Sequence, residues 1–335
     1  MDVDKLRALT RPTDAPALSV TVDGVRTDFS PRAITAVVGP NGSGKTTLMG
    51  RIAGRLSGGE VSPEGADVVL LTQRPGLPPR STAVEAVAMV TRDKVPAQEL
   101  LAAAGLHELA DVPVPALSGG QAAHVALVRA LAARPAVLIV DEPLAAVDVK
   151  SAERWRRFLH AARADRTTLL VTHDALDIAH LAQDMLVMES GRVRAHGATA
   201  RLLEAPPTGF VAALAGLNRL EGTVTEIGAS AVEVACGDIT VLAATEHAPL
   251  ALGQKVAVTF DPHAATLGAA PEACNQWEAR VLAVEATSLA AAQLRVDLGG
   301  HEATVPVDRE FALGVKVGNV VSLTVSKANV FVHPN

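Results

Sequence analysis

A glycine-rich segment near the start of the chain has the residue types that bind phosphate groups. Residues 39–46 read Gly-Pro-Asn-Gly-Ser-Gly-Lys-Thr, which fits the phosphate-loop pattern G-x-x-x-x-G-K-[ST]. Glycines let successive backbone N–H groups converge on phosphate oxygens, and a following helix adds the positive end of its dipole. We expect Lys45 to reach the β- and γ-phosphates of a nucleotide and the Thr46 hydroxyl to ligate Mg²⁺. The predicted nucleotide contacts here are Gly39, Pro40, Asn41, Gly42, Ser43, Gly44, Lys45, Thr46 and Thr47.

Two adjacent carboxylates, Asp141 and Glu142, end the apolar run 137–140. Ligands of open parallel sheets bind at the carboxyl ends of strands. There Asp141 can hold Mg²⁺, and Glu142 can orient and deprotonate an attacking water. An acidic pair at a strand end is common by itself, but beside a phosphate loop it predicts nucleotide hydrolysis.

A third group precedes the helical pattern at residues 122–133. It consists of Ser118, Gly119, Gly120 and Gln121. Ser118 is a natural N-cap, and the glycines leave backbone N–H groups uncovered, as at a phosphate-binding helix terminus. One chain then has two phosphate sites for one nucleotide. We therefore expect a head-to-tail dimer in which each γ-phosphate lies between the phosphate loop of one subunit and this turn of the other.

The elements that must position these groups alternate between apolar runs and helical stretches. The runs 33–38, 136–140 and 168–171 predict parallel strands buried on both faces. Downstream of about residue 217, short alternating strands with glycine turns predict an all-β region. The break falls near Pro206-Pro207.

The β region is internally duplicated. Residues 218–221 (Asn-Arg-Leu-Glu) match 275–278 (Asn-Gln-Trp-Glu) at an offset of 57, and 252–254 match 317–319 at an offset of 65. The second copy therefore has about 8 extra residues, most simply in one loop. The expected repeats are about 217–268 and 273–335.

Composition limits the class of protein. The chain has 335 residues, a net charge of −6, 49% apolar residues and 2% aromatic residues, with no Tyr. Its length suggests two domains, and its acidic balance argues against a nucleic-acid-binding protein. Cys236 and Cys274 are too few for a disulfide scaffold, so we expect free, buried thiols in a reducing compartment. We expect no signal peptide and no membrane span, and hence a cytoplasmic chain.

The three phosphate-site motifs described first are the phosphate loop, residues 118–121 and the pair Asp141-Glu142. They occur in the order and spacing typical of ABC transporter ATP-binding subunits, and residues 17–215 resemble such a subunit. The resemblance includes Asp148 and the segment Val171-Thr172-His173-Asp174. It implies an ATP-binding domain at 1–215, with a helical subdomain at about 74–134.

The resemblance also implies roles for individual residues. Gln73 would lie near the metal and the membrane partner, Asp148 would cross the dimer, and His173 would contact the γ-phosphate. The implied cofactors are ATP and Mg²⁺. The implied catalytic set is Glu142, His173 and Lys45, and the implied metal set is Thr46, Gln73 and Asp141.

The sequence departs from that family at three places. Residues 1–28 contain no aromatic residue to stack on adenine, so we expect aliphatic contacts to hold the base. His124 stands where an arginine usually follows the signature glutamine. The stretch from Lys45 to Gln73 is short, which predicts a trimmed β-subdomain.

Residues 216–335 resemble the accessory domain of importer ATPases, with molybdate-binding-like (TOBE or Mop) repeats. Residues 273–281 are similar to the opening of such repeats and 325–330 to their closing strand. This implies an oxyanion site at Asn275 and Lys327, with a purely structural barrel pair as the alternative. The expected fold class is α/β, a P-loop NTPase domain with a helical subdomain, followed by an all-β domain of two small OB-like barrels.

The implied function is the ATP-hydrolysing subunit of an ABC importer for an oxyanion, with molybdate first. The implied partners are a second copy or a paired ATP-binding subunit, transmembrane permease subunits at the cytoplasmic face of the membrane, and indirectly a solute-binding protein, but no nucleic acid. The alternatives are import of sulfate, iron, a sugar or a polyamine, and a soluble non-transport ABC ATPase. The acidic, single-unit sequence argues against that ATPase. A regulatory oxyanion-binding module with a dead ATPase is a further alternative, which intact Lys45, Asp141, Glu142 and His173 disfavour.

Overall fold

The structure is a computed structural model in which two compact units are separated between Leu202 and Leu203. This division precedes the expected boundary at 215, because helix α9 (Gly209–Leu214) packs against strand β10 (Asn218–Ile227) of the second unit. The expected start of the second repeat at residue 273 lies outside the described residues, as does the Cys274 side chain. The structure describes residues 1–13, 17–22, 25–74, 76–145, 147–244, 250–268, 274–288 and 291–334.

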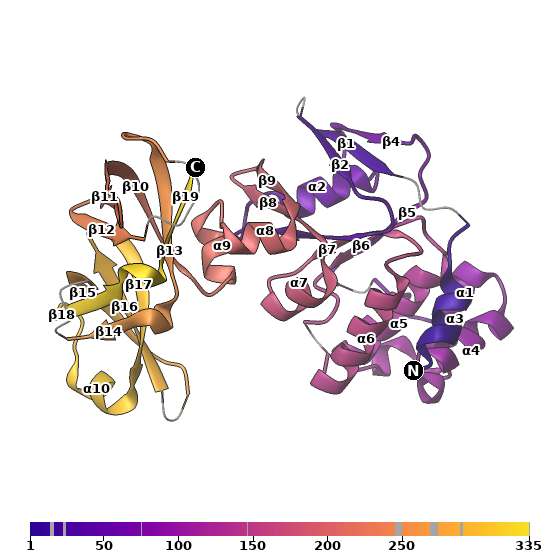
Figure 1. The fold of residues 1–335 in the computed structure, drawn as a ribbon. Coiled ribbons are helices and arrows are strands. Elements are labelled where there is room, and N and C mark those ends of the chain that lie inside the picture. Colours follow the sequence, from indigo (N-terminus) through magenta and orange to yellow (C-terminus); the bar gives the residue numbers. More distant parts are fainter. Residues whose placement is uncertain are drawn as a thin grey trace. The chain divides into compact units, whose positions relative to one another are not determined.

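A six-stranded sheet forms the centre of the first unit, and it confirms the predicted parallel arrangement (Figure 1). Its strands are parallel except for the last, which pairs antiparallel at the edge. Helices cover the sheet, so β3 and β7 are buried along their whole length and consist of apolar and threonine side chains. In spatial order the strands are β5 (Val68–Leu71), β6 (Val137–Asp141), β7 (Thr167–Val171), β3 (Ile34–Val38), β8 (Asp184–Glu189) and β9 (Arg192–Ala198).

A smaller antiparallel sheet packs on helix α2 (Lys45–Ile52). Its order is β2 (Val25–Phe29), β1 (Leu18–Val22) and β4 (Gly59–Ser62). Leu18, Val20 and Phe29 share a buried core with Met49 of α2 and with central strands. The phosphate-loop helix is thereby held between two sheets.

Three helices, α3, α4 and α5, lie within residues 74–134, the predicted helical segment, and other helices flank the large sheet (Figure 1). An N-terminal helix that the sequence patterns did not predict, α1, contacts α4, α5 and α6. Within the described chain, no helix is both long and apolar enough to cross a membrane. The helices of this unit are α1 (Val3–Thr10), α2, α3 (Ala83–Thr91), α4 (Lys94–Ala103), α5 (Gly119–Ala132), α6 (Val149–Ala162), α7 (Ala175–Leu181) and α8 (Thr199–Glu204), with 3₁₀ turns at His107–Leu109 and Val114–Ala116.

Two five-stranded antiparallel sheets form the second unit, which confirms the all-β prediction. They enclose one apolar core that includes Phe260 and Trp277. A short helix α10 (Arg309–Gly314) and 3₁₀ turns at Pro262–Ala264 and Lys327–Asn329 connect strands. One sheet is β12 (Ile239–Ala243), β11 (Val232–Cys236), β10, β13 (Lys255–Phe260) and β19 (Val330–Pro334); the other is β14 (Ala265–Leu267), β18 (Val320–Ser326), β15 (Cys274–Ala286), β16 (Ala291–Leu298) and β17 (His301–Asp308).

The strand pairing reproduces the sequence repeat. Asn218 pairs with Phe260 in one sheet and Asn275 pairs with Val325 in the other, which gives the same offsets of 57 and 65. The repeats also exchange strands: β19 completes the first sheet and β14 completes the second. The extra residues of the second copy do not form a single loop as predicted. They lengthen the strands β15, β16 and β17 relative to β10, β11 and β12, while the segment that contains α10 is as long as its counterpart in the first repeat.

Candidate active site

The phosphate loop adopts a backbone that requires glycine. Gly39, Gly42 and Gly44 have φ values of 148°, 78° and 96°, a region that residues with a Cβ rarely enter. At Gly39 a Cβ would lie 2.0 Å from the carbonyl oxygen of Met188, so the loop also packs directly on β8. The loop follows β3 and leads into α2, which is the strand–loop–helix context that the motif predicts.

The Lys45 side chain folds back and contacts the backbone of the phosphate loop. Its Nζ donates hydrogen bonds to the carbonyl oxygens of Gly39 at 2.7 Å and Pro40 at 3.0 Å, and it lies 3.4 Å from Oγ of Ser43. Partial burial lowers the pKa of Lys45, while the nearby carboxylates of Asp141 and Glu142 oppose that shift. The ammonium group therefore lies beside the loop and the acidic pair at once.

Glu142 is the point where three separate sequence motifs meet. Its Oε1 lies 2.8 Å from Nδ1 of His173, and its Oε2 accepts a hydrogen bond of 3.0 Å from Nε2 of Gln73. The backbone of Glu142 has a φ of 49°, which is uncommon for a residue with a side chain, and its N–H donates to the carbonyl of Val171 at 2.9 Å. Backbone and side chain are both fixed, so the carboxylate has one defined orientation.

Oxygen donors suited to Mg²⁺ come from three elements around the loop. Thr46 has an exposed side chain at the start of α2, Asp141 ends β6, and Gln73 follows β5. Burial raises the pKa of Asp141, and so does the charge of Glu142, while Lys45 opposes the shift. Among the described residues, no three His, Cys, Asp or Glu side chains form a metal cluster. Hydroxyl, amide and carboxylate oxygens fit a hard cation that also binds nucleotide phosphates.

A cavity of about 760 Å³ adjoins the phosphate loop at Gly44 and Thr47. One face of the β1–β2 hairpin lines it, and the residues it presents are aliphatic except for one hydroxyl; they are Val20, Val22, Val25 and Thr27. No aromatic side chain is among the described residues that line this cavity.

The turn before α5 is a capping box. Ser118 Oγ accepts from the backbone N–H of Gln121 at 3.2 Å, and Gln121 Oε1 accepts from the N–H of Ser118 at 2.9 Å. The sequence predicted the serine cap but missed the returning glutamine, although the S-x-x-Q spacing indicates it. Asp148 caps α6 without a returning side chain: its Oδ1 accepts from the N–H of Ser151 at 3.1 Å, and hydrogen bonds from the side chain and then the backbone of Ser151 lower its pKa. The dimer roles of these turns stay predictions.

His124 is buried within the helical part of the unit. Its ring lies 5.9 Å from that of Trp155, and burial lowers its pKa. Nε2 of His124 has no hydrogen-bond partner among the described residues. The family arginine is thus replaced by an imidazole that packs on an aromatic ring.

The structure corrects one predicted oxyanion ligand, Asn275. Its Oδ1 accepts from the N–H of Leu242 at 2.6 Å, and its Nδ2 donates to the carbonyls of Leu242 and Val325 at 2.9 and 3.2 Å. The side chain is buried and both amide hydrogens are used, so Asn275 ties two strands together instead of facing a ligand. Lys327 is half-buried in a 3₁₀ turn, and its role stays a prediction.

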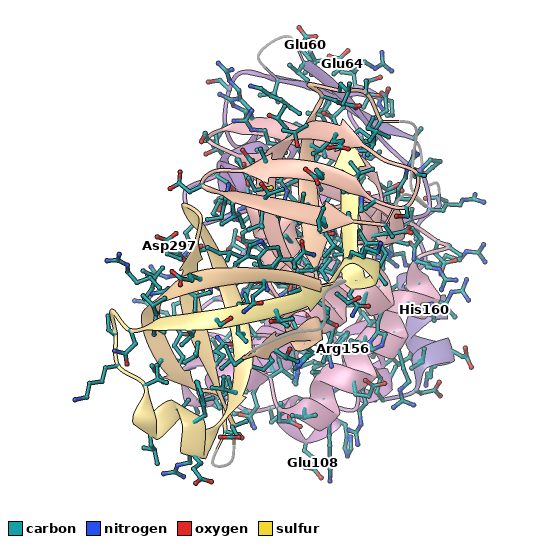
Figure 2. The ribbon with its side chains drawn as sticks, turned by 60° about the vertical axis from the view of Figure 1, so that its left-hand side comes forward. Glu60, Glu64, Glu108, Arg156, His160 and Asp297 are labelled. Atoms are coloured by element: carbon teal, nitrogen blue, oxygen red, sulfur yellow. The ribbon has the colours of Figure 1, made fainter. Side chains whose placement is uncertain are left out.

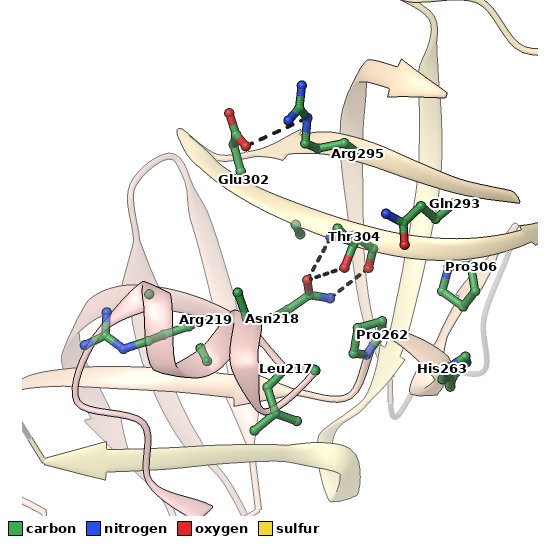
Figure 3. A pocket seen from close by; sticks show the side chains of 15 residues that line it. Leu217, Asn218, Arg219, Pro262, His263, Gln293, Arg295, Glu302, Thr304 and Pro306 are labelled. Carbon is green, nitrogen blue, oxygen red and sulfur yellow. Dashed lines mark hydrogen bonds and ion pairs between the residues drawn. The ribbon is translucent and has the colours of Figure 1, made fainter. Parts of the chain in front are cut away.

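The second unit has a cavity of about 620 Å³ that the sequence did not reveal (Figure 3). At its base, Asn218 exchanges hydrogen bonds with the backbone of Thr304 at 2.7 and 2.9 Å. Arg295 and Glu302 face each other at 3.9 Å on its rim. The only sequence feature that pointed to this cavity was the match of Asn218 to Asn275 in the repeat.

Two family descriptions match the chain. The ABC transporter family matches residues 22–145, which include the phosphate loop and Glu142. The TOBE domain family matches residues 271–332, in the second unit.

The curated relatives are named as import ATP-binding proteins for different solutes. A molybdenum import protein, ModC of Mycobacterium tuberculosis, is 36% identical over 223 residues, which cover 57% of this chain and 60% of the relative. A spermidine/putrescine import protein, PotA of Thermobifida fusca, is 36% identical over 70% of this chain and 66% of its own length. A sulfate/thiosulfate import protein, CysA 1 of Chromobacterium violaceum, is 33% identical over 93% of both chains. The chain therefore spans about 60% of the mycobacterial relative but nearly all of the Chromobacterium protein.

Solved structures support the fold of the first unit. A dimeric ATP-binding cassette in a post-hydrolysis state, bound to ADP and phosphate, matches with a TM-score of 0.50 at 22% identity. It covers 54% of this chain and 98% of that structure. At this identity the likeness concerns the fold alone.

Proposed function

This chain belongs to the family of ABC transporter ATP-binding subunits, and from that premise we propose that it hydrolyses ATP to power an importer. The observation that carries the proposal is the Glu142 carboxylate, which Gln73 and His173 hold beside the phosphate loop. Gln73 is 69 positions before Glu142 in the sequence and His173 is 31 positions after it, yet both side chains contact its carboxylate. Such a convergence is the arrangement that a general base requires.

In this proposal Glu142 accepts a proton from the attacking water. A carboxylate that receives two hydrogen bonds cannot rotate freely, so its remaining lone pairs point in a defined direction. With both ring nitrogens protonated, His173 would donate to Glu142 and to the phosphoryl oxygens, whose developing negative charge it would stabilise, and Lys45 would exchange its carbonyl partners for phosphate oxygens. Thr46, Gln73 and Asp141 would hold Mg²⁺, which neutralises phosphate charge when it is bound.

A dimer would complete the site. Ser118 and the N–H groups of Gly119 and Gly120 would contact the nucleotide of a second subunit, and Asp148 would lie across the interface. The partners we propose are a second ATP-binding subunit and transmembrane permease subunits. The chain would be held peripherally at the cytoplasmic face of the membrane, with a solute-binding protein as an indirect partner.

We propose that the transported solute is an oxyanion, with molybdate as the first candidate. The name of the mycobacterial relative and the resemblance of residues 325–330 to molybdate-binding repeats support it. Sulfate is the second candidate, because the sulfate/thiosulfate relative matches over 93% of both chains and so includes the second unit. Molybdate and sulfate are both tetrahedral dianions, so similar binding sites could recognise either anion.

Steady-state hydrolysis of ATP by the purified chain, alone and with its permease, tests the enzymatic proposal. Glu142→Gln keeps the hydrogen-bonding shape but removes the base, so we expect ATP binding to persist while the rate falls at least about 100-fold. Glu153→Gln, at an exposed carboxylate on α6, is the matched control and should retain the parent rate. Hydrolysis by Glu142→Gln at the parent rate would contradict the assignment of the base.

Uptake of labelled oxyanions by cells that lack this chain tests the solute. Loss of molybdate uptake with intact sulfate uptake supports the first candidate, and the reverse supports the second. Calorimetry of the full chain with molybdate, tungstate and sulfate tests binding by the second unit. If Lys327 neutralises a bound anion, Lys327→Gln should weaken that binding; an unchanged affinity would exclude this role.

A further inference from the structure

Arg156, which Figure 2 labels, lies on helix α6 and pairs with two carboxylates of the segment that carries His173. Its Nε lies 2.5 Å from Oδ1 of Asp177, and its Nη2 lies 3.5 Å from Oδ2 of Asp174. The Asp177 side chain is only 4% exposed and that of Arg156 only 16%. Burial raises the pKa of Asp177, and the hydrogen bond from Arg156 counteracts that shift. This ion pair is therefore largely shielded from water, so its attraction is screened less than that of a surface pair.

Local hydrogen bonds link residues 172–177 on both sides of His173. The Thr172 hydroxyl accepts from the N–H of Asp174 at 3.1 Å and lies 3.5 Å from Oδ2 of Asp177. Oδ1 of Asp174 in turn accepts from the N–H groups of Leu176 and Asp177 at 2.8 and 3.4 Å. The two carboxylates of this segment are the same two that contact Arg156. Arg156 therefore contacts the two carboxylates that bond to the Thr172 side chain before His173 and to the backbone of residues 176 and 177 after it.

One cavity of about 410 Å³ brings this ion pair and the reactive carboxylate together. Its lining includes Arg156, Asp174 and Asp177 together with Glu142 and His173. Although Arg156 makes no described hydrogen bond to Glu142, it anchors the segment whose histidine does. The guanidinium fork can address two carboxylates at once, whereas an ammonium group is a single point charge.

We propose that Arg156 is a positioning residue for ATP hydrolysis, which fixes His173 against Glu142 by holding Asp174 and Asp177. The inference rests on the proposed function for its catalytic meaning. Whether the Arg156 guanidinium holds the His173 imidazole in place can be tested independently of hydrolysis. Loss of Arg156 leaves the phosphate loop intact, so the effect should appear in kcat and not in the KM for ATP.

Kinetics of Arg156→Met provide the first test. We expect kcat to fall by about 10- to 100-fold, the scale of a misplaced reacting group, while the KM for ATP changes less than about twofold. Arg156→Lys should recover part of the rate, because one of the two contacts survives. Arg157→Met, at the neighbouring exposed arginine of α6, is the matched control and should behave as the parent.

A second variant separates positioning from folding, because Arg156→Met leaves a buried carboxylate without its partner. Arg156→Met/Asp177→Asn removes both charges, so we expect a melting temperature close to that of the parent together with the low kcat. A parent-like kcat in this folded double variant would overturn the proposal.

The placement of His173 can also be measured without hydrolysis. An ionised carboxylate only accepts hydrogen bonds, so the contact with Glu142 requires the neutral imidazole to carry its proton on Nδ1. Two-bond ¹H–¹⁵N spectra of histidine-labelled protein at about pH 8, where an unperturbed histidine is neutral, report this tautomer. His173→Ala identifies the signal.

We expect Arg156→Met to shift the His173 signal toward the Nε2-protonated form, and Arg157→Met to leave it unchanged. An unaltered Nδ1-protonated signal in Arg156→Met would overturn the positioning role. If no variant and no parent protein hydrolyses ATP, the proposed function fails, and these spectra still decide how His173 is placed.

Discussion

Asn218 and Asn275 make the same contact from opposite repeats of the second unit. Asn218 exchanges hydrogen bonds with the backbone N–H and carbonyl of Thr304, and Asn275 does so with those of Leu242. Each asparagine lies at the start of a strand of its own repeat and ties that strand to a strand of the other repeat. Because β14 and β19 are also exchanged, the two repeats depend on each other for stability.

Removal of either asparagine should therefore destabilise the second unit strongly. We expect Asn275→Ala to lower the free energy of unfolding by about 2–4 kcal/mol, because the backbone groups of Leu242 lose their partners in a buried place. Asn218→Ala should have a similar effect. Gln276→Ala, an exposed control on the same strand, should cost less than about 0.5 kcal/mol. Denaturant unfolding of the full chain, followed through Trp277, measures the difference; a loss below 1 kcal/mol at Asn275 would contradict the bridging role.

The two contacts of Glu142 should contribute unequally to catalysis. His173→Ala removes a hydrogen-bond partner and a charge-stabilising group, so we expect kcat for ATP to fall about 100-fold. Gln73→Ala removes only an orienting hydrogen bond, and we expect a loss of about tenfold. His180→Ala, at an exposed histidine on α7, should leave the rate unchanged. Equal losses in the two site variants would show that His173 does no more than orient the carboxylate.

Local features of the first unit were predictable from the sequence. The phosphate loop, the buried parallel strands and the acidic pair at the end of β6 are each encoded within a few neighbouring residues. Helix α1 was not predictable in this way. Its position depends on Arg7 pairing with Asp165 and on Arg166 donating to the carbonyl of Thr10, contacts that span more than 150 positions.

The second unit shows where a sequence match misleads about a role. The repeat alignment placed Asn218 and Asn275 at equivalent positions, and the pairing register agrees. Nothing in the sequence indicates that the backbone of Leu242 fills the hydrogen-bonding capacity of the Asn275 amide. The strand exchange was hidden for the same reason, because partner choice in a sheet depends on contacts between distant segments.

Cys236 should be chemically inert in the folded chain. The thiol is buried, and burial raises its pKa to about 12, so almost no thiolate exists at neutral pH. In a Cys274→Ser background, we expect maleimide labelling at about pH 7.5 to be slower than that of the unfolded chain by at least about 100-fold. Mass spectrometry of timed samples, with and without denaturant, measures the two rates. Equal rates would mean that the β10–β12 core opens readily.

The pair formed by Arg7 and Asp165 should make stability depend on pH in the acid range. The hydrogen bond and charge of Arg7 hold the pKa of Asp165 below its ordinary value. The unfolded chain then binds more protons than the folded chain between the two pKa values. The stabilisation is therefore complete above the ordinary aspartate pKa and is lost as the pH falls through the lowered one.

For Arg7→Met we expect a loss of about 1–3 kcal/mol at pH 7, because Asp165 is buried and loses a bidentate partner. That loss should shrink at acid pH, as the pH falls through the lowered pKa of Asp165 and the carboxyl becomes protonated in both states. Arg11→Met, at a more exposed arginine 3.3 Å from the same carboxylate, should cost less than about 1 kcal/mol at either pH. Urea unfolding at both pH values distinguishes the outcomes, and a pH-independent loss in Arg7→Met would assign the contribution of this side chain to apolar packing instead of charge.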